Sequence, residues 1–198
     1  MEFSTIDAPA QDTQTMVSVG LTHEMPSSTR MLLAGDGSTT VLLEALVGTR
    51  LRVRVASQQL VPFTRIPKSI REALAADGVS CFVERRSELH SSKNVVVSRN
   101  RVISVHSGFE AHFPAHDTKP IGHRLREERL PQAREMLASG VTLASAEFDS
   151  RSCAFKEYVI NSPSRSPLYV AETFNPDVVR CAPLRQIPGT KERHEFQR

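Results

Sequence analysis

Residues 81–90, with the sequence CFVERRSELH, decide the predicted fold. Apolar or small side chains recur at every second position, which is the period of a β-strand. The alternation places Arg85 on one face with Val83, Ser87 and Leu89, and it places Arg86 on the opposite face. A polar turn at 91–94 leads into a second strand-like run at 95–106. The two runs therefore predict an antiparallel hairpin.

The rest of the chain predicts further strands and short helices around this hairpin. The other predicted elements are strands at 51–55, 154–161 and 168–174 and helices at 41–46, 67–74 and 121–138, the last of them interrupted at Pro131. The strands at 154–161 and 168–174 form a second hairpin that turns at 162–167. No strand-helix-strand alternation occurs, so we expect an α+β domain with one antiparallel sheet.

Composition and charge narrow the class of protein. The chain has 198 residues, 39% hydrophobic and 24% charged, which suits one globular domain. We expect a flexible N-terminal arm at 1–26, the domain at 27–178 and a C-terminal tail at 179–198. No apolar run is long enough to span a membrane, and the start does not resemble a secretory signal. Three cysteines without a CxxC spacing predict reduced thiols and a cytoplasmic protein.

The net charge of +3 and the pI near 9.0 are mild, and the basic residues form no run with interleaved aromatics. We therefore expect no nucleic-acid partner, and a basic interior site for an anionic small molecule fits the charge equally well. Residues 35–40, GDGSTT, lack the phosphate-loop pattern and predict a turn with a helix cap. His112 and His116 are separated by Pro114, so no metal site is expected. No GxSxG turn is present for a serine nucleophile.

Two charged residues on apolar strand faces are the candidate site. Arg85 shares a face with Val83 and Leu89, and Glu172 shares a face with Val170 and Phe174. A buried charge is costly unless it meets an opposite charge or a polar partner. The pair could form an internal salt bridge, or it could form the two poles of a polar ligand pocket. The spacing alone leaves both interpretations open.

Several segments in order resemble the chorismate pyruvate-lyase family. Residues 30–44, RMLLAGDGSTTVLLE, are similar to the family's leucines, its Asp-Gly/Ser-Ser-x-Thr segment and its leucine-rich helix. Residues 85–89, RRSEL, resemble the family's Arg-x-hydrophobic-x-Leu strand, and residues 120–122, PIG, resemble its Pro-Leu-Gly. The further similar segments are the first strand at 51–58 and the closing hairpin at 157–160 and 170–174. Together they span residues 30 to 176.

The resemblance implies a fold and a reaction. The fold is α+β, with a single antiparallel sheet of about six strands, helices packed on it and an enclosed ligand pocket. The reaction is the elimination of pyruvate from chorismate to give 4-hydroxybenzoate, without a metal or an organic cofactor. The expected partner is thus a small anionic cyclohexadiene or aromatic acid, bound by a monomer or a homodimer.

The same resemblance implies roles for particular residues. Arg85 would bind the ring carboxylate, and Glu172 would accept or exchange a proton at the ring hydroxyl; both are the expected catalytic residues. The backbone amide of Ile121 or Gly122 would add a donor. Ser87 replaces the aliphatic residue usual in the family and joins the expected substrate-binding set. A one-residue slip in register would exchange Arg85 for Arg86, which is the alternate.

Two other functions share this fold. One is an enzyme of secondary metabolism that acts on a different chorismate-like or aromatic acid. The other is a non-catalytic aromatic-acid-binding module, similar to the effector-sensing domain of some bacterial transcription regulators. Such regulators carry a helix-turn-helix domain upstream, and the roughly 25 to 30 residues before the match are too few for one. The lyase is therefore the expected function.

Overall fold

The computed structural model describes residues 25–181 except 77, 108, 110–112, 130 and 146–147. Six strands form one sheet in the order β1-β2-β3-β6-β5-β4, and every neighbouring pair is antiparallel. The strands are β1 (Arg52–Pro62), β2 (Cys81–His90), β3 (Val96–Val105), β4 (Ala133–Ser145), β5 (Arg151–Ser162) and β6 (Arg165–Phe174). The helices are α1 (Ser27–Ala34), α2 (Thr39–Val47), η1 (Phe63–Arg65), α3 (Lys68–Ala73) and α5 (Ile121–Glu127).

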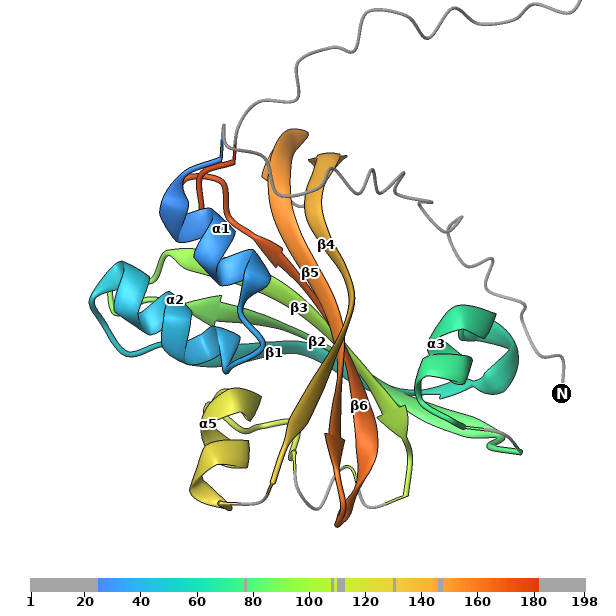
Figure 1. The fold of residues 1–198 in the computed structure, drawn as a ribbon. Coiled ribbons are helices and arrows are strands. Elements are labelled where there is room, and N and C mark those ends of the chain that lie inside the picture. Colours follow the sequence, from blue (N-terminus) through green and yellow to red (C-terminus); the bar gives the residue numbers. More distant parts are fainter. Residues whose placement is uncertain are drawn as a thin grey trace, which may run out of the picture.

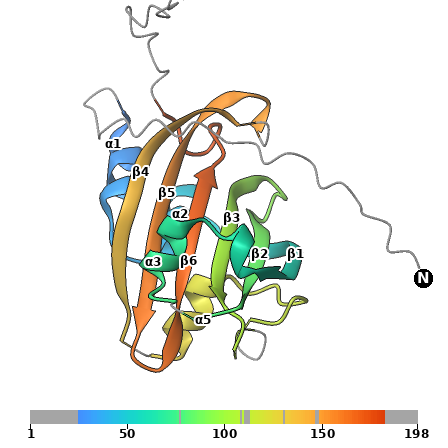
Figure 2. The same cartoon turned by 90° about the vertical axis from the view of Figure 1, so that its right-hand side faces the viewer.

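The helices cover the two faces of the sheet unequally. Helices α1, α2 and α5 lie on one face, which we call the inner face, and α3 lies on the other, the outer face (Figure 1). Figure 2 shows the same arrangement with α3 in front of the strands and α1 and α2 behind them. The α+β class with a single six-stranded antiparallel sheet is therefore confirmed.

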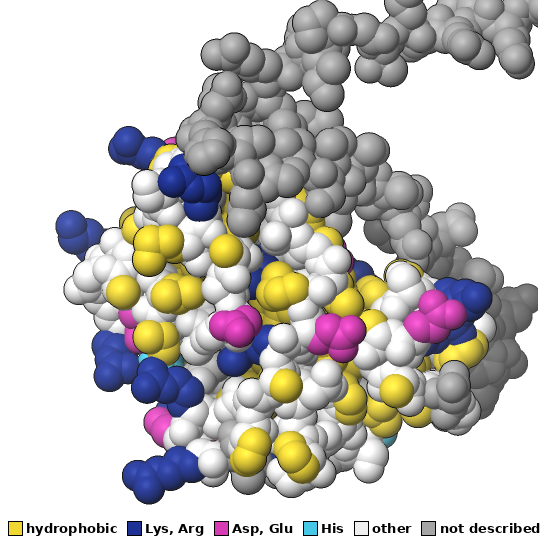
Figure 3. Space-filling model, in the orientation of Figure 1, with side chains coloured by type: hydrophobic (Ala, Val, Ile, Leu, Met, Phe, Trp, Pro, Cys, Tyr) yellow, Lys and Arg dark blue, Asp and Glu magenta, His cyan; other side chains and the backbone are white. Residues whose placement is uncertain are grey.

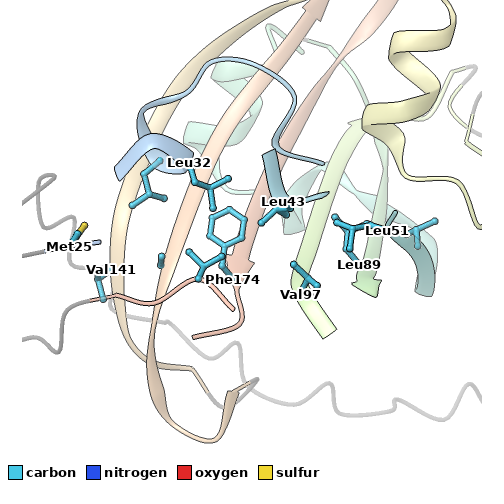
Figure 4. Packing of buried hydrophobic residues seen from close by; sticks show 12 residues of the cluster. Met25, Leu32, Leu43, Leu51, Leu89, Val97, Val141 and Phe174 are labelled. Carbon is cyan, nitrogen blue, oxygen red and sulfur yellow. The ribbon is translucent and has the colours of Figure 1, made fainter. Parts of the chain in front are cut away.

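The inner-face core joins α1 and α2 to the sheet. Phe174 at the end of β6 is fully buried, with Leu32 of α1 and Leu43 of α2 in the same cluster (Figure 4). Burying a side chain of this size from water contributes roughly 2–3 kcal/mol. On the outer face, α3 packs its Ile70 and the following Leu74 over Phe82 of β2. The helices are held to the sheet mainly by these apolar contacts.

The predicted strands at 81–90 and 95–106 correspond to β2 and β3, but the predicted helix at 121–138 is only partly right. Helix α5 ends at Glu127, and Ala133–Ser145 is the edge strand β4. The start of this strand, AREMLAS, consists largely of good helix formers. Pairing with β5 from Ala133↔Asn161 to Ser145↔Arg151 overrides that local preference, because tertiary contacts outweigh weak propensities.

Smaller differences follow from edge position and turn geometry. The first strand continues to Pro62, which an edge strand tolerates because the missing N–H faces outward. The second hairpin turns at residues 163–164, since Ser162 pairs with Arg165. Helix α2 ends at Gly48, whose φ of 69° is the left-handed conformation that glycine permits. Ser38 precedes α2, but its side chain makes no capping hydrogen bond.

The ends of the predicted domain lie close to the edges of the described residues. Helix α1 begins at Ser27, and Val179 is buried in the inner-face core. Thr29 Oγ1 donates a hydrogen bond to the carbonyl oxygen of Arg180 at 2.6 Å, which ties α1 to the chain after β6. Most of the predicted arm and tail, residues 1–24 and 182–198, lies outside the described residues. Within the described part, no helix combines the length and the apolar character that a membrane span needs.

Candidate functional site

A small cavity lies between the inner face of the sheet and the starts of α2 and α5. It encloses about 40 Å³. Its polar lining residues are Ser38, Thr39, Thr40, Ser87, Asn100, Arg134, Tyr158 and Glu172. Its apolar side is formed by Val53, Leu89, Val102, Pro120, Ile121, Gly122, Ile160 and Val170. Every strand of the sheet thus contributes a residue, so the sheet register fixes the geometry of the site.

Glu172 and Tyr158 form the buried acidic side of the cavity. The Tyr158 hydroxyl donates a hydrogen bond to Glu172 Oε2 at 3.1 Å. Burial raises the pKa of Glu172, although Thr39, Lys156 and Tyr158 act in the opposite direction. Burial and the neighbouring Glu172 also raise the pKa of Tyr158 well above its usual value. Tyr158 therefore stays protonated at neutral pH and can donate.

Lys156 lies directly beside this acidic side and is fully buried. It is the cross-strand partner of Glu172 between β5 and β6. Its Nζ donates to the carbonyl oxygen of Leu32 at 3.2 Å and to that of Gly35, both at the end of α1. Burial lowers the pKa of Lys156, whereas the Glu172 carboxyl acts to raise it. Lys156 thus joins the site to the α1–α2 connection.

Besides Thr39 Oγ1, whose side chain interacts with Glu172, three polar atoms on the cavity wall have no hydrogen-bond partner within the part of the chain that the structure describes. They are Ser38 Oγ, Asn100 Oδ1 and Arg134 Nε, and all three are buried. Buried polar atoms are nearly always satisfied by protein, water or ligand. One donor from Arg134, one amide oxygen and one hydroxyl therefore face a common space. Such a set can bind an anion that also carries a hydroxyl or another donor.

A wider groove of about 650 Å³ adjoins the cavity on the α1, α2 and α5 side. Ser38 and Arg134 line both spaces. The groove adds the apolar side chains Met31, Val41, Leu42 and Leu125 and the basic side chains Arg126 and Arg129. Figure 3 shows Lys and Arg side chains spaced around this side of the molecule with hydrophobic side chains between them. The combined site therefore has a cavity lined by polar and apolar side chains and a groove lined by apolar and basic ones.

The structure places most of the predicted site residues at the cavity. Glu172, Ser87, Ile121 and Gly122 all line it. Arg85 lies on the inner face and is 1% exposed, but it is not among the lining residues. Its NH1 donates to Gln58 Oε1 at 3.1 Å and to the carbonyl oxygens of residues 113 and 114 at 3.2 and 3.0 Å.

The alternate, Arg86, is on the outer face with its side chain 53% exposed. It approaches Glu84, not the cavity. The strand period thus distinguished the two arginines correctly. Among the described residues no ion pair joins Arg85 to Glu172, so these two residues do not form the internal salt bridge that the sequence left open. The cation that lines the cavity with Glu172 is Arg134.

Sequence reasoning missed Arg134, Tyr158, Lys156, Ser38 and Asn100. Arg134 fell in a segment predicted as helix, so its strand face was not considered. Lys156 and Tyr158 alternate with apolar residues in the predicted strand 154–161, which is the same signal that singled out Glu172. That alternation could have found both residues. Asn100 is opposite Glu172 only because of the β3–β6 register, which the sequence does not reveal.

Gly122 brings the starts of α5 and α2 together. A Cβ added at Gly122 would lie 2.6 Å from Thr40 Oγ1 and 2.9 Å from Ser38 Oγ. Gly122→Ala should therefore push the two helices apart and lower the free energy of unfolding by about 1–3 kcal/mol, as overpacking usually does. Urea unfolding measures this. Gly37→Ala is the matched control, because a Cβ there meets no atom within 4 Å. Equal effects of the two substitutions would contradict the close contact.

The buried carboxyl of Glu172 predicts a pH dependence of stability. Its pKa is raised above the usual 4.5, so the folded protein retains this proton to a higher pH than the unfolded chain does. Its stabilising contribution is complete below that usual value and is lost as the pH rises through the folded-state pKa. Glu172→Gln cannot ionise, so as the pH rises above about 5 it should lose less stability than the wild type. Urea midpoints at several pH values test this.

The control for that experiment is Glu127→Gln, since Glu127 is exposed and its pKa is lowered by the hydrogen bond from Lys119. This variant should keep the wild-type pH profile above pH 5 or so. If Glu172→Gln and the wild type have parallel profiles, Glu172 has an ordinary pKa and is not buried as described.

The histidines form no metal site among the described residues. His112 lies outside them, and no group of three His, Cys, Asp or Glu side chains could hold a metal ion in the part that is described. His123 Nε2 lies 2.8 Å from Glu44 Oε1, and the same carboxyl oxygen accepts a hydrogen bond from the Leu51 amide. This contact ties α5 to α2 at the edge of the site.

Comparison with known proteins places the fold among regulator domains. Neither a family model nor a curated protein matches the sequence. The effector domain of PhnF from Mycobacterium smegmatis superposes with a TM-score of 0.53 at 13% identity, over 72% of this chain and 91% of that one. The C-terminal domain of the histidine utilization repressor from Pseudomonas syringae pv. tomato superposes with a TM-score of 0.52 at 10% identity, over 67% of this chain and 96% of that one.

A third similar structure is the ligand-binding domain of a protein from Bordetella bronchiseptica described as a GntR-family transcriptional regulator. Its TM-score is 0.50 at 14% identity, over 67% of this chain and 91% of that one. At such identities the likeness shows the fold alone. That fold is related to the one of chorismate lyase, so the resemblance in the sequence pointed to the right architecture.

The predicted function, a chorismate pyruvate-lyase, is wrong. The similar structures are domains of transcriptional regulators and not lyases, which also overturns the placement in aromatic biosynthesis or secondary metabolism. Arg85, the expected carboxylate-binding residue, donates through NH1 to three acceptors, and its Nε has no partner among the described residues.

Proposed function

We propose that this domain is a non-catalytic sensor that binds a small anionic effector at the cavity and the adjoining groove. The observation that carries the proposal is the set of cavity-wall atoms without a partner among the described residues, Ser38 Oγ, Asn100 Oδ1 and Arg134 Nε. Ser38 and Arg134 also line the groove of about 650 Å³, whereas Asn100 lines the cavity alone. The fold shared with regulator domains called effector or ligand-binding domains supports the same conclusion.

The charges of the site indicate how the effector would lie. Its anionic group would accept hydrogen bonds from Arg134 and Ser38, and guanidinium groups favour planar or tetrahedral oxyanions. The free backbone amides at the start of α2 add positive potential at the same place. A hydroxyl at the other end would meet Glu172 and Asn100. The apolar groove walls would cover the body of the molecule, and Arg126 and Arg129 would attract it.

Binding would require α2 and α5 to separate, because the cavity between them is small. Only a few contacts hold the two helix starts together, mainly the close approach at Gly122 and the His123–Glu44 contact. An effector that enters there would shift the position of α2. Lys156 would pass that shift to α1 through its bonds to Leu32 and Gly35. The domain would thus report occupancy by moving its helices while the sheet stays fixed.

Of the predicted partners, the proposal keeps a small anionic ligand but no longer specifies its ring. A small anionic ligand remains the proposed partner, whether aromatic or not, with Glu172, Ser87, Ile121 and Gly122 as proposed contacts. The direct role of Arg85 at the ligand stays a prediction; its contacts support a role in holding the loop at 113–114. The absence of a nucleic-acid partner also stays a prediction, since the similar domains belong to regulators. The oligomeric state, monomer or homodimer, and the cytoplasmic location stay predictions as well.

The experiment that tests the proposal is a thermal-shift screen followed by recovery of the compounds. The protein is heated with chorismate, 4-hydroxybenzoate, other aromatic carboxylates and sugar phosphates, and each compound is then analysed by mass spectrometry. We expect at least one anionic compound to raise Tm in a concentration-dependent way and to be recovered unchanged. Conversion of a bound compound would overturn the non-catalytic assignment. No shift with any small anion would count against effector binding.

A further inference from the structure

A second pocket lies on the outer face of the sheet, which is opposite the face that carries the cavity. It has a volume of about 190 Å³. Gln59 of β1, Glu84 and Arg86 of β2, Arg101 of β3 and Arg65 of η1 supply its polar lining. Because the sheet separates the two spaces, a ligand in this pocket would not touch Glu172 or Arg134.

The pocket concentrates positive charge on neighbouring strands. Arg86 and Arg101 are directly opposite one another in the β2–β3 register. Like charges in such positions destabilise a sheet unless an anion lies between them. Glu84 supplies one: its Oε1 accepts from Arg101 Nε at 2.5 Å and from Arg86 NH2 at 3.3 Å. Gln59 Nε2 donates to the other carboxyl oxygen at 3.4 Å.

One carboxylate does not balance this pocket. Burial acts to raise the pKa of Glu84, but Arg101 and Arg86 overcome it and the pKa is lowered, so Glu84 is ionised at neutral pH. Three guanidinium charges, from Arg65, Arg86 and Arg101, less one carboxylate leave two positive charges. Farther along the same face, Glu88 pairs with Arg99. The pocket therefore carries a net positive charge.

We propose that this outer pocket binds an oxyanion, either free phosphate or the phosphate or carboxylate group of a small metabolite. Glu84 fixes the two guanidinium groups through one N–H of each, which leaves further N–H donors on each for the ligand. Arg65 contributes a third set of donors from η1. The volume suits a tetrahedral or carboxylate anion with a short organic substituent. Glu84 itself serves as a positioning residue and not as a ligand contact.

Phosphate titration followed by nuclear magnetic resonance tests the site directly. Inorganic phosphate, sulfate and acetate are titrated into the full chain while the Nε–Hε signals of its arginines are observed. We expect saturable shifts of the Arg65 and Arg101 signals. Arg65→Gln should weaken phosphate binding at least about fivefold, because a charge-assisted donor is lost. Arg65 is exposed, so this variant should fold. Comparing the affinities for sulfate and phosphate with the affinity for acetate shows whether the pocket prefers a tetrahedral anion or a carboxylate.

Two control variants distinguish phosphate binding in the outer pocket from binding elsewhere on the protein. Arg52→Gln removes an exposed charge on β1 outside the pocket, and it should change phosphate affinity less than about twofold if binding is local. Arg134→Gln alters the inner cavity and should leave the outer-pocket shifts unchanged. Equal losses in Arg65→Gln and Arg52→Gln, or shifts without saturation, would overturn the proposal. Loss of all phosphate binding in Arg134→Gln would also overturn it while supporting the inner site.

Discussion

Replacing Lys156 by methionine is expected to lower the free energy of unfolding by about 3 kcal/mol, because two hydrogen bonds from a buried charged donor are lost. The side chain is fully buried, and its Nζ bonds to the carbonyl oxygens of Leu32 and Gly35. Methionine fills a similar volume but leaves both carbonyls without this donor. It also removes the charge opposite Glu172. Urea unfolding at neutral pH gives the value.

Lys68→Met is the matched control, because Lys68 forms only an exposed pair with Glu72 on α3. Such surface pairs contribute roughly 0–1 kcal/mol. The double variant Lys156→Met/Glu172→Gln should be less destabilised than the sum of the single variants, since the electrostatic interaction between the two side chains is lost in each single variant and only once in the double variant. A loss below about 1 kcal/mol for Lys156→Met would show that the buried lysine does not hold α1 to the sheet.

Arg134→Gln is expected to weaken effector binding by roughly 2–3 kcal/mol, or about 30- to 150-fold, because a hydrogen bond between two charged groups is lost. Arg134 is the cation that lines both the cavity and the groove, and its Nε has no partner within the described residues. Isothermal titration with any anion that raises Tm measures the change. The fold should be little affected, because the side chain is only partly buried.

Arg126→Gln provides the comparison, since Arg126 lines the groove but not the cavity. It should slow association and change affinity only about two- to threefold, as peripheral charges do. If Arg126→Gln weakens binding more than Arg134→Gln does, the anion lies in the groove near Arg126 and the cavity is not its site.

The local pattern of the sequence was enough to predict much of the sheet. Alternation located β2 and distinguished Arg85 from Arg86 without any knowledge of neighbours, and the polar turn at 91–94 predicted β3 as the return strand. It also placed Glu172 on the inner face, where the structure has it buried. These predictions succeeded because a half-buried strand must alternate, whatever it pairs with.

The parts that failed depend on contacts between distant segments. The strand β4 has a helix-forming sequence at its start and is a strand only because β5 pairs with it. Arg134 was lost with that segment. Arg85 was predicted to bind a ligand because a buried guanidinium needs acceptors, and within the described residues that physical requirement is met only at NH1. The acceptors of NH1 are Gln58 and the carbonyls of residues 113 and 114, which no periodicity could reveal, and Nε has no partner among the described residues.

The predicted function failed for a different reason. One architecture serves both a lyase and effector domains, so the fold alone could not distinguish chemistry from binding. The presence of a buried glutamate on β6 did not separate them either. What overturned the predicted function is the likeness of the fold to domains of transcriptional regulators, which the sequence alone did not reveal.

The most direct test of the central claim is a crystal structure of the protein with the small anion that raises Tm most. We predict that the intact compound lies between α2, α5 and the sheet, with its anionic group bonded to Arg134 Nε and Ser38 Oγ and its other end toward Glu172. A reaction product in that place, or a compound bound away from these residues, would contradict the proposed sensor function.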